Sequence, residues 1–457
     1  MAYDAGAGSR SCVLTLQGHC GGVSSIVAVG ASQGGCYVST AVDGSSIIAV
    51  WASLHHQVQP CWRFSPGPNN YSSSNSNSSS GSPHLPSVTC LTSDESNLFF
   101  SAHSDRTLRV WSRAAPHKPV RTFPSFSDRF FHLLQQRNDK ISDPFRPAPP
   151  SIPPLQHSDI ISSLAFSPKS HLLYSGSWDS TVKAWSLNDF QCSETIYAHT
   201  APVTALAVCP EGFLYTACAN GEVKAWKKEF YVRRHGLMAT LNQTDSKAMN
   251  ALALSGDGEL LIGAGEACAI SIWGRKEGER HMSVLWARVM GCHGESILCL
   301  SAVGVFVVSG SADKKIRVWR VGRIQNHKRG AARLVCKRTL EGHTGPVLAI
   351  ATVMASSTAD HDGDKRARCL YVYSGSADKS MKVWKVDGLD DNEYSSNGNV
   401  EHSDQKIVAS RHHRVVDMKD YPIFKPPGLL HMILHAPYSS FKQSFQSCCL
   451  AIARGLS

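Results

Sequence analysis

The sequence repeats a short pattern in which apolar and polar side chains alternate before a tryptophan. In residues 181–185, TVKAW, Val182 and Ala184 point to one side of an extended chain, and the other three side chains point to the opposite side. Alternation with a period of two predicts β-strands rather than helices. A turn residue, most often Asp, stands six positions before the tryptophan, so each copy predicts a turn followed by a strand.

The pattern recurs along most of the chain. Six copies share its spacing, and a longer seventh copy, STAVDGSSIIAVW, ends at Trp51. Successive tryptophans from Trp185 to Trp319 are 41 to 47 residues apart, close to the roughly 40–45 residues of a four-stranded propeller blade. The six regular copies are SAHSDRTLRVW (ending at Trp111), SGSWDSTVKAW (Trp185), TACANGEVKAW (Trp226), GAGEACAISIW (Trp273), SGSADKKIRVW (Trp319) and SGSADKSMKVW (Trp384).

An upstream histidine accompanies most copies. It precedes an apolar run, such as PVTALAV at 202–208 or PVLAI at 346–350. One repeat therefore predicts a His turn, a strand, a second strand that contains Gly, an Asp turn, and a third strand that ends in Trp. The histidines at this position are His19, His157, His199, His293 and His343.

The Gly-His turns, the SGSxD turns and the strand-ending tryptophans resemble the WD-repeat β-propeller family. Seven copies cover roughly residues 11–386. The resemblance implies an all-β fold, a seven-bladed WD-repeat β-propeller closed by an N-terminal strand in the last blade. Residues 12–16, CVLTL, suit that strand and would pair beside residues 381–385. Such closure hides the free edges of the first and last sheets.

In that family a strand Ser or Thr, the turn His and the turn Asp complete a hydrogen-bonded chain with the Trp. Buried polar groups of this kind are costly unless each is paired. Two copies depart from the pattern, because Asn220 and Ala267 stand where Asp is expected. The resemblance implies structural roles for His19, Trp51, Asp105, Trp111, His157, Asp179, Trp185, His199, Trp226, Trp273, His293, Asp313, Trp319, His343, Asp378 and Trp384.

Three insertions and two ends fall outside the repeats. The first insertion is a Ser/Asn tract with too little apolar surface to fold. The second contains a candidate short helix, DRFFHLLQQRND, and a Pro-rich run, and the third is a polar loop. Residues 119–123 form a possible outer strand within the second insertion. We expect a flexible N-terminus (1–10), a propeller (11–387) with insertions at 65–87, 113–156 and 354–367, and a disordered C-terminal extension (388–457).

Composition indicates where in the cell the protein acts and which classes of partner its charge permits. The chain has 457 residues, 42% of them hydrophobic, and a net charge of +10. Neither an apolar signal core nor a run of about 20 apolar residues occurs, so we expect reduced cysteines, no membrane span and a cytoplasmic or nuclear location. The positive charge permits an acidic partner or nucleic acid without requiring either.

The sequence contains none of the common active-site motifs that we looked for. No G-x-S-x-G elbow, P-loop, HExxH or Cys-rich zinc spacing is present. His55-His56 and His412-His413 are adjacent pairs, and neighbouring strand residues point to opposite faces, so neither pair is a good chelate. We therefore predict a protein that is not an enzyme and that has no catalytic, metal or cofactor residues.

Trp178 is the candidate for partner binding that departs most from the repeat. It precedes the turn Asp, where other copies have Ser or Ala. An exposed Trp is costly unless a loop or a ligand covers it, so it either contacts a partner or packs under the 113–156 insertion. The other candidates for partner binding are His103, Arg106, Lys314 and Lys379.

Basic residues also follow the fourth and sixth copies, at 227–234 and 320–338. Both segments contain an outer strand, so the charges would lie on the rim. They indicate either charged protection of a sheet edge or a docking stripe for acidic protein or nucleic acid.

A narrower resemblance rests on LQGHCGGVSS at 16–25 together with the SGSWD and SGSAD copies, which are similar to the plant JINGUBANG-like WD-repeat proteins. That resemblance implies a monomeric, non-enzymatic regulator that acts through protein contacts, transcription factors among them, in plant signalling. Two alternatives stay open: a substrate receptor of a ubiquitin ligase, although its W-D-x-R signal is absent, and a nucleic-acid-associated propeller.

Overall fold

The computed structural model describes strands and short turns from one end of the repeat region to the other. Within the described residues, twenty-eight strands form seven antiparallel sheets of four strands each. The described residues are 12–17, 21–29, 36–41, 48–54, 57–64, 87–94, 98–112, 119–125, 128, 155–229, 234–241, 247–276, 278–323, 331–356 and 368–387.

Six sheets are built from four consecutive strands. Short turns join neighbouring strands, as expected for antiparallel hairpins. The first three of these sheets contain β2 (Val23–Val29), β3 (Cys36–Ala41), β4 (Ile48–Leu54) and β5 (Gln57–Phe64); β6 (Val88–Ser93), β7 (Leu98–His103), β8 (Leu108–Ser112) and β9 (Arg121–Phe123); and β10 (Ile161–Ser167), β11 (Leu172–Ser177), β12 (Thr181–Ser186) and β13 (Cys192–Tyr197).

The other sheets continue this order. They contain β14 (Val203–Val208), β15 (Phe213–Cys218), β16 (Val223–Lys228) and β17 (His235–Leu241); β18 (Met249–Leu254), β19 (Leu261–Gly265), β20 (Ile270–Arg275) and β21 (Met282–Val289); β22 (Ile297–Val303), β23 (Phe306–Ser311), β24 (Ile316–Arg323) and β25 (Ala332–Leu340); and β26 (Val347–Ser356), β27 (Arg368–Ser376) and β28 (Ser380–Val386) with β1 (Cys12–Gln17).

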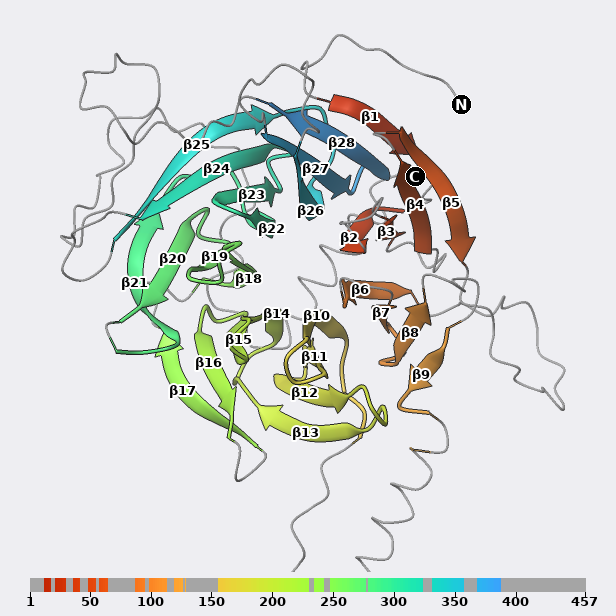
Figure 1. Cartoon of the computed structure of the whole chain (residues 1–457), viewed down its shortest axis with the longest axis vertical. Coiled ribbons are helices and arrows are strands. Elements are labelled where there is room, and N and C mark those ends of the chain that lie inside the picture. Colours follow the sequence, from red (N-terminus) through yellow and green to blue (C-terminus); the bar gives the residue numbers. More distant parts are fainter. Residues whose placement is uncertain are drawn as a thin grey trace, which may run out of the picture. The chain divides into compact units, whose positions relative to one another are not determined.

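The sheets lie as sectors around a common centre (Figure 1). The first strand of each sheet is innermost and contacts the first strand of the next sheet, in the order β2, β6, β10, β14, β18, β22, β26 and back to β2. The strand at the other end of each sheet lies at the rim, and in the last sheet this strand is β1. This arrangement places the turns between second and third strands on one face of the ring, because all sheets run in the same sense.

Apolar side chains pack between neighbouring sheets rather than in one central core. Between the sheets β6–β9 and β10–β13, Phe123 contacts Trp185 with ring centroids 5.2 Å apart, and both side chains are buried. Between β14–β17 and β18–β21, Tyr215 and Trp273 belong to one buried cluster. Large rings at these seams remove much apolar area from water, which stabilises the contact between blades.

Strand β1 adds to the last sheet as its outer strand. It pairs antiparallel with β28, with Thr15 opposite Lys382 and Leu16 opposite Met381. Lys382 Nζ also donates to Thr15 Oγ1 at 3.0 Å. The first described strand is therefore hydrogen-bonded to the last one, and the edge of β28 is paired.

The prediction of seven equivalent Trp-centred blades needs correction. Six blades, not seven, are supported by side chains in the described structure: those that begin at β6, β10, β14, β18, β22 and β26. In the sheet β2–β5 only the backbone of β3, β4 and β5 is described, so the expected role of the Trp51 side chain falls outside the description, as does His19. One of the six, β18–β21, also lacks the paired polar chain, as shown below.

The insertion boundaries also differ from the sequence prediction. Strand β9 lies where the sequence predicted an outer strand, at 119–123 within the second insertion, and completes a sheet. Strand β26, in contrast, extends to Ser356 within the expected 354–367 insertion. Most of the 65–87 insertion, residues 1–10 and residues 388–457 lie outside the described residues. Among the residues that are described, none forms a helix with the length and apolar character needed to cross a membrane.

Deleting residues 12–17 tests the role of β1. We expect the melting temperature to fall by at least about 5 °C and light scattering to rise, because β28 would expose an unpaired edge. The control is a deletion of residues 1–10, which leaves β1 in place. Equal melting curves for the two deletions would contradict this role.

Candidate interaction site

One chain of hydrogen bonds holds the tryptophan in three blades. In β10–β13, Trp185 Nε1 donates to Ser175 Oγ at 2.9 Å, and His157 Nε2 lies 2.8 Å from the same oxygen. His157 Nδ1 donates to Asp179 Oδ2 at 2.9 Å, because a carboxylate can only accept. The chain recurs with similar distances as Trp319–Ser309–His293–Asp313 and Trp384–Ser374–His343–Asp378.

The carboxylate at the end of this chain also shapes the turn. Asp179 Oδ1 accepts from the backbone N–H and the hydroxyl of Thr181 at 2.9 and 2.6 Å. Burial opposes ionisation of Asp179, but hydrogen bonds from His157 and Thr181 outweigh it and hold the pKa of this carboxyl below its usual value. Burial lowers the pKa of the His157 imidazole, although Asp179 attracts its charged form.

The remaining described blades depart from this chain. In β6–β9, Trp111 Nε1 donates to Ser101 Oγ at 2.7 Å, and His103 Nε2 lies 2.8 Å from that oxygen. Among the described residues of this blade, His103 makes the contact to the shared hydroxyl that the turn histidine makes in the three blades above. Its side chain has no exposed surface, so the structure places this candidate for partner binding in the core instead. Asp105 accepts from Thr107 at 2.6 Å and bends the turn.

The blade β14–β17 keeps the histidine but moves the carboxylate. Trp226 Nε1 donates to Thr216 Oγ1 at 3.0 Å, and His199 Nε2 lies 2.8 Å from the same oxygen. The His199 Nδ1 partner is Glu222 Oε2 at 3.4 Å, since Asn220 occupies the Asp position. Sequence reasoning missed Glu222, although a carboxylate two residues after Asn220 was visible.

The blade β18–β21 has no such chain in its described residues. Trp273 is fully buried, and its Nε1 has no hydrogen-bond partner. Gly263 stands where other blades have Ser or Thr, and a Cβ there would lie 2.9 Å from the Trp273 ring. This tryptophan is held by packing alone.

The exposed candidates lie at the tips of the turns that these chains fix. Arg106, Lys314 and Lys379 each follow the turn Asp and have φ between 65° and 68°, the left-handed region. All three are exposed. Their backbone N–H groups close the turns by donating to the carbonyl three residues back, for example from Arg106 to His103 O at 2.8 Å. The cations therefore project from rigid turns on one face of the ring.

Trp178 stands beside them on the neighbouring blade. Its side chain is half-buried, and its backbone N–H donates to Ile160 O at 3.0 Å. Arg106 reaches toward the same blade, because its Nη1 donates to Ser158 O at 3.3 Å. Most of the 113–156 insertion lies outside the described residues, so partner contact and packing under that insertion both stay open for Trp178.

A buried polar link between blades was not foreseen from the sequence. Tyr174 Oη lies 2.9 Å from His235 Nε2, and His235 Nδ1 pairs with Glu194 at 2.6 Å. The link joins β11 and β13 to β17 of the next sheet. No spacing in the sequence could have signalled it, because the three residues lie in two different repeats.

Comparison with known proteins agrees with this geometry. The family model for the WD domain, G-beta repeat, matches residues 75–112, 153–186, 190–227, 287–320 and 334–385. The chain carries WD repeats. The matched segments end at or just after the tryptophans of the β6–β9, β10–β13, β14–β17, β22–β25 and last sheets.

Similar proteins carry several names. The chain is 29% identical over 167 residues to the Periodic tryptophan protein 2 homolog of Caenorhabditis elegans, covering 36% of this chain and 17% of that protein. It is 31% identical over 172 residues to the Small ribosomal subunit protein RACK1y of Oryza sativa subsp. japonica, covering 36% and 49%. It is 24% identical over 289 residues to the Nuclear distribution protein nudF 1 of Talaromyces marneffei, covering 63% and 46%.

The matched stretch thus spans less than a fifth of the Periodic tryptophan protein 2 relative and less than half of the other two. The relatives come from an animal, a plant and a fungus. They support WD repeats in general, and they do not single out the plant JINGUBANG-like group that the sequence suggested.

Replacing Trp185 or Trp273 by Phe measures how much the hydrogen bond of the indole N–H contributes to the free energy of unfolding. Both rings are buried, so both variants lose similar apolar area. Only Trp185→Phe also breaks a hydrogen bond, so we expect it to lower the unfolding free energy by about 1–2 kcal/mol more than Trp273→Phe. Urea denaturation of both variants checks this, and equal losses would contradict it.

Stability should fall in mild acid. Burial lowers the pKa values of His157 and His293, so the unfolded chain binds more protons than the folded one once the pH falls below the ordinary value of 6.5. We expect the midpoint of urea unfolding to be lower at pH 5 than at pH 7.5. In His157→Asn the midpoint should change less between these two pH values. A midpoint that stays constant or rises toward pH 5 would count against neutral buried histidines.

Proposed function

We propose that this protein is a non-enzymatic scaffold that binds other proteins through the turn face of its WD repeats. The single observation that carries the proposal is the set of exposed cations at the turn tips beside a half-buried tryptophan. Charged residues at such positions select partners of opposite charge, and tryptophan is a frequent anchor in interfaces. The partner is a protein with acidic side chains and an apolar contact for Trp178.

The left-handed backbone at the turn tips supports a functional role for these cations. A left-handed φ costs a residue with a Cβ roughly 1–2 kcal/mol, and Gly221 occupies the equivalent turn position in β14–β17 with φ 86°. Glycine therefore fits this turn, yet Arg106, Lys314 and Lys379 occupy it in other blades. Strain retained at exposed positions is a motive for assigning function.

The positions form an arc. Lys314 and Lys379 stand on neighbouring blades, the sheet β2–β5 follows, and then come Arg106 and Trp178 on the next two blades. Asp313 and Asp378 face inward to their histidines, so they do not fully cancel the charges of Lys314 and Lys379. The arc gives a partner several contacts on one rigid surface.

The biological setting is a further part of the proposal. A relative is named as a small ribosomal subunit protein, in line with a propeller that works within an assembly. The JINGUBANG-like resemblance supports a cytoplasmic or nuclear regulator in plant signalling or transcription control, with transcription factors as partners. The proposed role requires only one copy of the chain, so we propose that the protein acts as a monomer.

A charge-reversal pair tests the proposed face. Arg106, Lys314 and Lys379 are changed together to Glu, and the proteins retained by affinity purification are compared with wild type. The control changes Lys169, Lys276 and Arg280 to Glu; these exposed cations lie at turns on the opposite face and give the same change in net charge. We expect the first variant to lose at least about tenfold in affinity for partners and the second to retain it.

Two further arms separate the alternatives. Trp178→Ala should weaken the same partners if the tryptophan is an anchor, and nuclease treatment should leave them bound. Partners that vanish with nuclease, together with a steep salt dependence, would favour the nucleic-acid reading. Retention of the same proteins by all variants, including a truncation after Asp387, would overturn the assignment of this face.

A further inference from the structure

One turn of the ring has exchanged three residues around its histidine. In β10–β13 the second strand and turn place Ser177, Asp179 and Thr181 two residues apart, and β22–β25 and the last sheet begin the same series with Ser and Asp. In β14–β17 the same positions are Cys218, Asn220 and Glu222. The exchange replaces a hydroxyl by a thiol and moves the carboxylate two residues along the chain.

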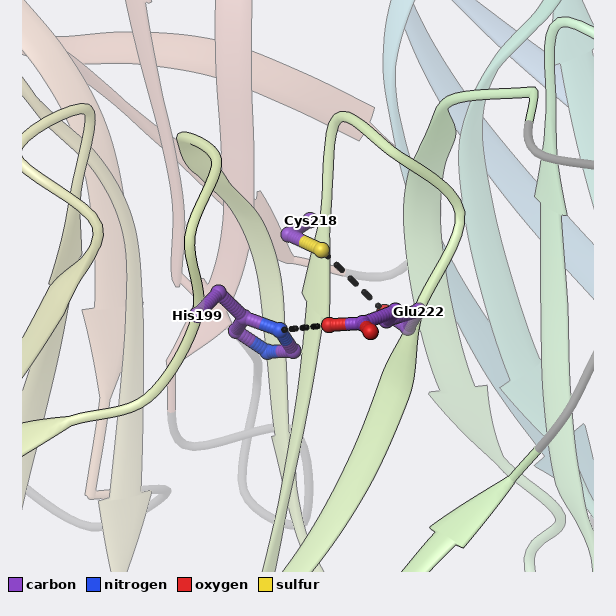
Figure 2. Close-up of side chains that lie close together, drawn as sticks. All are labelled: His199, Cys218 and Glu222. Atoms are coloured by element: carbon purple, nitrogen blue, oxygen red, sulfur yellow. Dashed lines mark hydrogen bonds and ion pairs between the residues drawn. The ribbon is translucent and has the colours of Figure 1, made fainter.

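These side chains gather around His199 (Figure 2). One ligand atom each from His199, Cys218 and Glu222 lies within 4.8 Å of the other two. The His199 and Cys218 side chains are buried, while 41% of the Glu222 side chain is exposed. Three ligands of a tetrahedral zinc ion stand roughly 3.5 Å apart, given Zn–N, Zn–O and Zn–S bonds of about 2.0–2.3 Å. Small side-chain rotations would bring the three atoms to that spacing.

We propose that His199, Cys218 and Glu222 form a zinc site at the turn face of the β14–β17 blade. A thiolate, an imidazole nitrogen and a carboxylate are a ligand set that zinc prefers, whereas magnesium and calcium take oxygen ligands. The fourth position falls to water, on the exposed side of Glu222. Among the described residues, no other turn brings together such a set of ligands.

The hydrogen bonds around His199 suit a ligand. In the three blades with the complete chain, the turn Asp lies 2.8–3.0 Å from the histidine Nδ1 and requires a proton there. At His199 the nearest carboxylate oxygen is 3.4 Å away. With its proton on Nε2, His199 donates to Thr216 Oγ1 at 2.8 Å and leaves the Nδ1 lone pair for the metal. Metal-bound histidines commonly donate their second N–H in this way.

Burial opposes the charged form of two of the three side chains, His199 and Cys218. Burial and the nearby Lys224 lower the pKa of His199 to about 4, so the imidazole is neutral and needs to lose no proton to solvent. Burial raises the pKa of the Cys218 thiol, so binding must displace its proton.

Lys224 competes with the ion for the carboxylate. Its Nζ lies 3.4 Å from Glu222 Oε2 and donates to Ala198 O at 3.0 Å. An ammonium group this close repels a cation and occupies the same oxygen. Lys224→Gln removes that charge, so it should tighten metal binding.

Cobalt(II) is the probe, because it takes zinc sites and a cobalt–thiolate bond absorbs in the near ultraviolet. The full chain is stripped with a chelator and titrated with Co²⁺, and Zn²⁺ is then added to displace the band. We expect one equivalent of Co²⁺ to give the band in wild type, no such band in Cys218→Ser, and at least about tenfold weaker binding in Glu222→Thr. The control, Cys268→Ser, removes a thiol from a turn in the next blade and should keep the band.

The variants are chosen to fold. Serine occupies the Cys218 position in three other blades, and threonine occupies the Glu222 position in β10–β13, so near-ultraviolet circular dichroism should match wild type. A band of equal strength in Cys218→Ser, or its absence from wild type, would overturn the site. If Cys218→Ser does not fold, the cobalt affinity of Glu222→Thr decides: an unchanged value overturns the site, and a weakened one supports it.

Discussion

The structure depends on one shared hydroxyl. In each complete blade a single Ser oxygen receives the indole N–H of the tryptophan and contacts the turn histidine, which reaches the turn Asp. This chain crosses from the third strand to the second and on to the loop that enters the sheet, so it joins three segments that the backbone ladder alone leaves independent. Buried, it is strong because every member is paired, and for the same reason each member is costly to remove.

The same chain determines which residues are displayed. The Asp turns its carboxylate inward to the histidine and to the backbone of the turn, and the next residue adopts a left-handed φ at the tip of the turn. A rigid buried network and a variable exposed tip are thus consecutive in the sequence. That arrangement allows Arg106, Lys314 and Lys379 to differ from Ser180 and Gly221 without disturbing the core, which is how function is added to a repeated fold.

Two neighbouring blades show opposite departures from the repeat. In β18–β21, Gly263 occupies the position of the hydroxyl residue, and Trp273 is buried with an unpaired N–H. Packing between sheets therefore holds this tryptophan in place. In β14–β17 the hydroxyl is kept in Thr216, while the turn has exchanged its polar groups for a thiol, an amide and a carboxylate. The first departure weakens the blade, whereas the second gathers ligands that a structural turn does not require.

The sequence by itself predicted the inner strands and the repeat, because alternation of period two and fixed spacing are local properties of the chain. The family resemblance added the His and Asp that belong to the chains of Trp185, Trp319 and Trp384. Only the tertiary structure decided what depends on contacts between repeats. It placed His103 in the core rather than on the surface, brought Glu194 and His235 together from different blades, and showed Glu222 beside His199 and Cys218. Spacing along the chain does not encode those distances, since neighbouring sheets meet through side-chain packing that depends on shape in three dimensions.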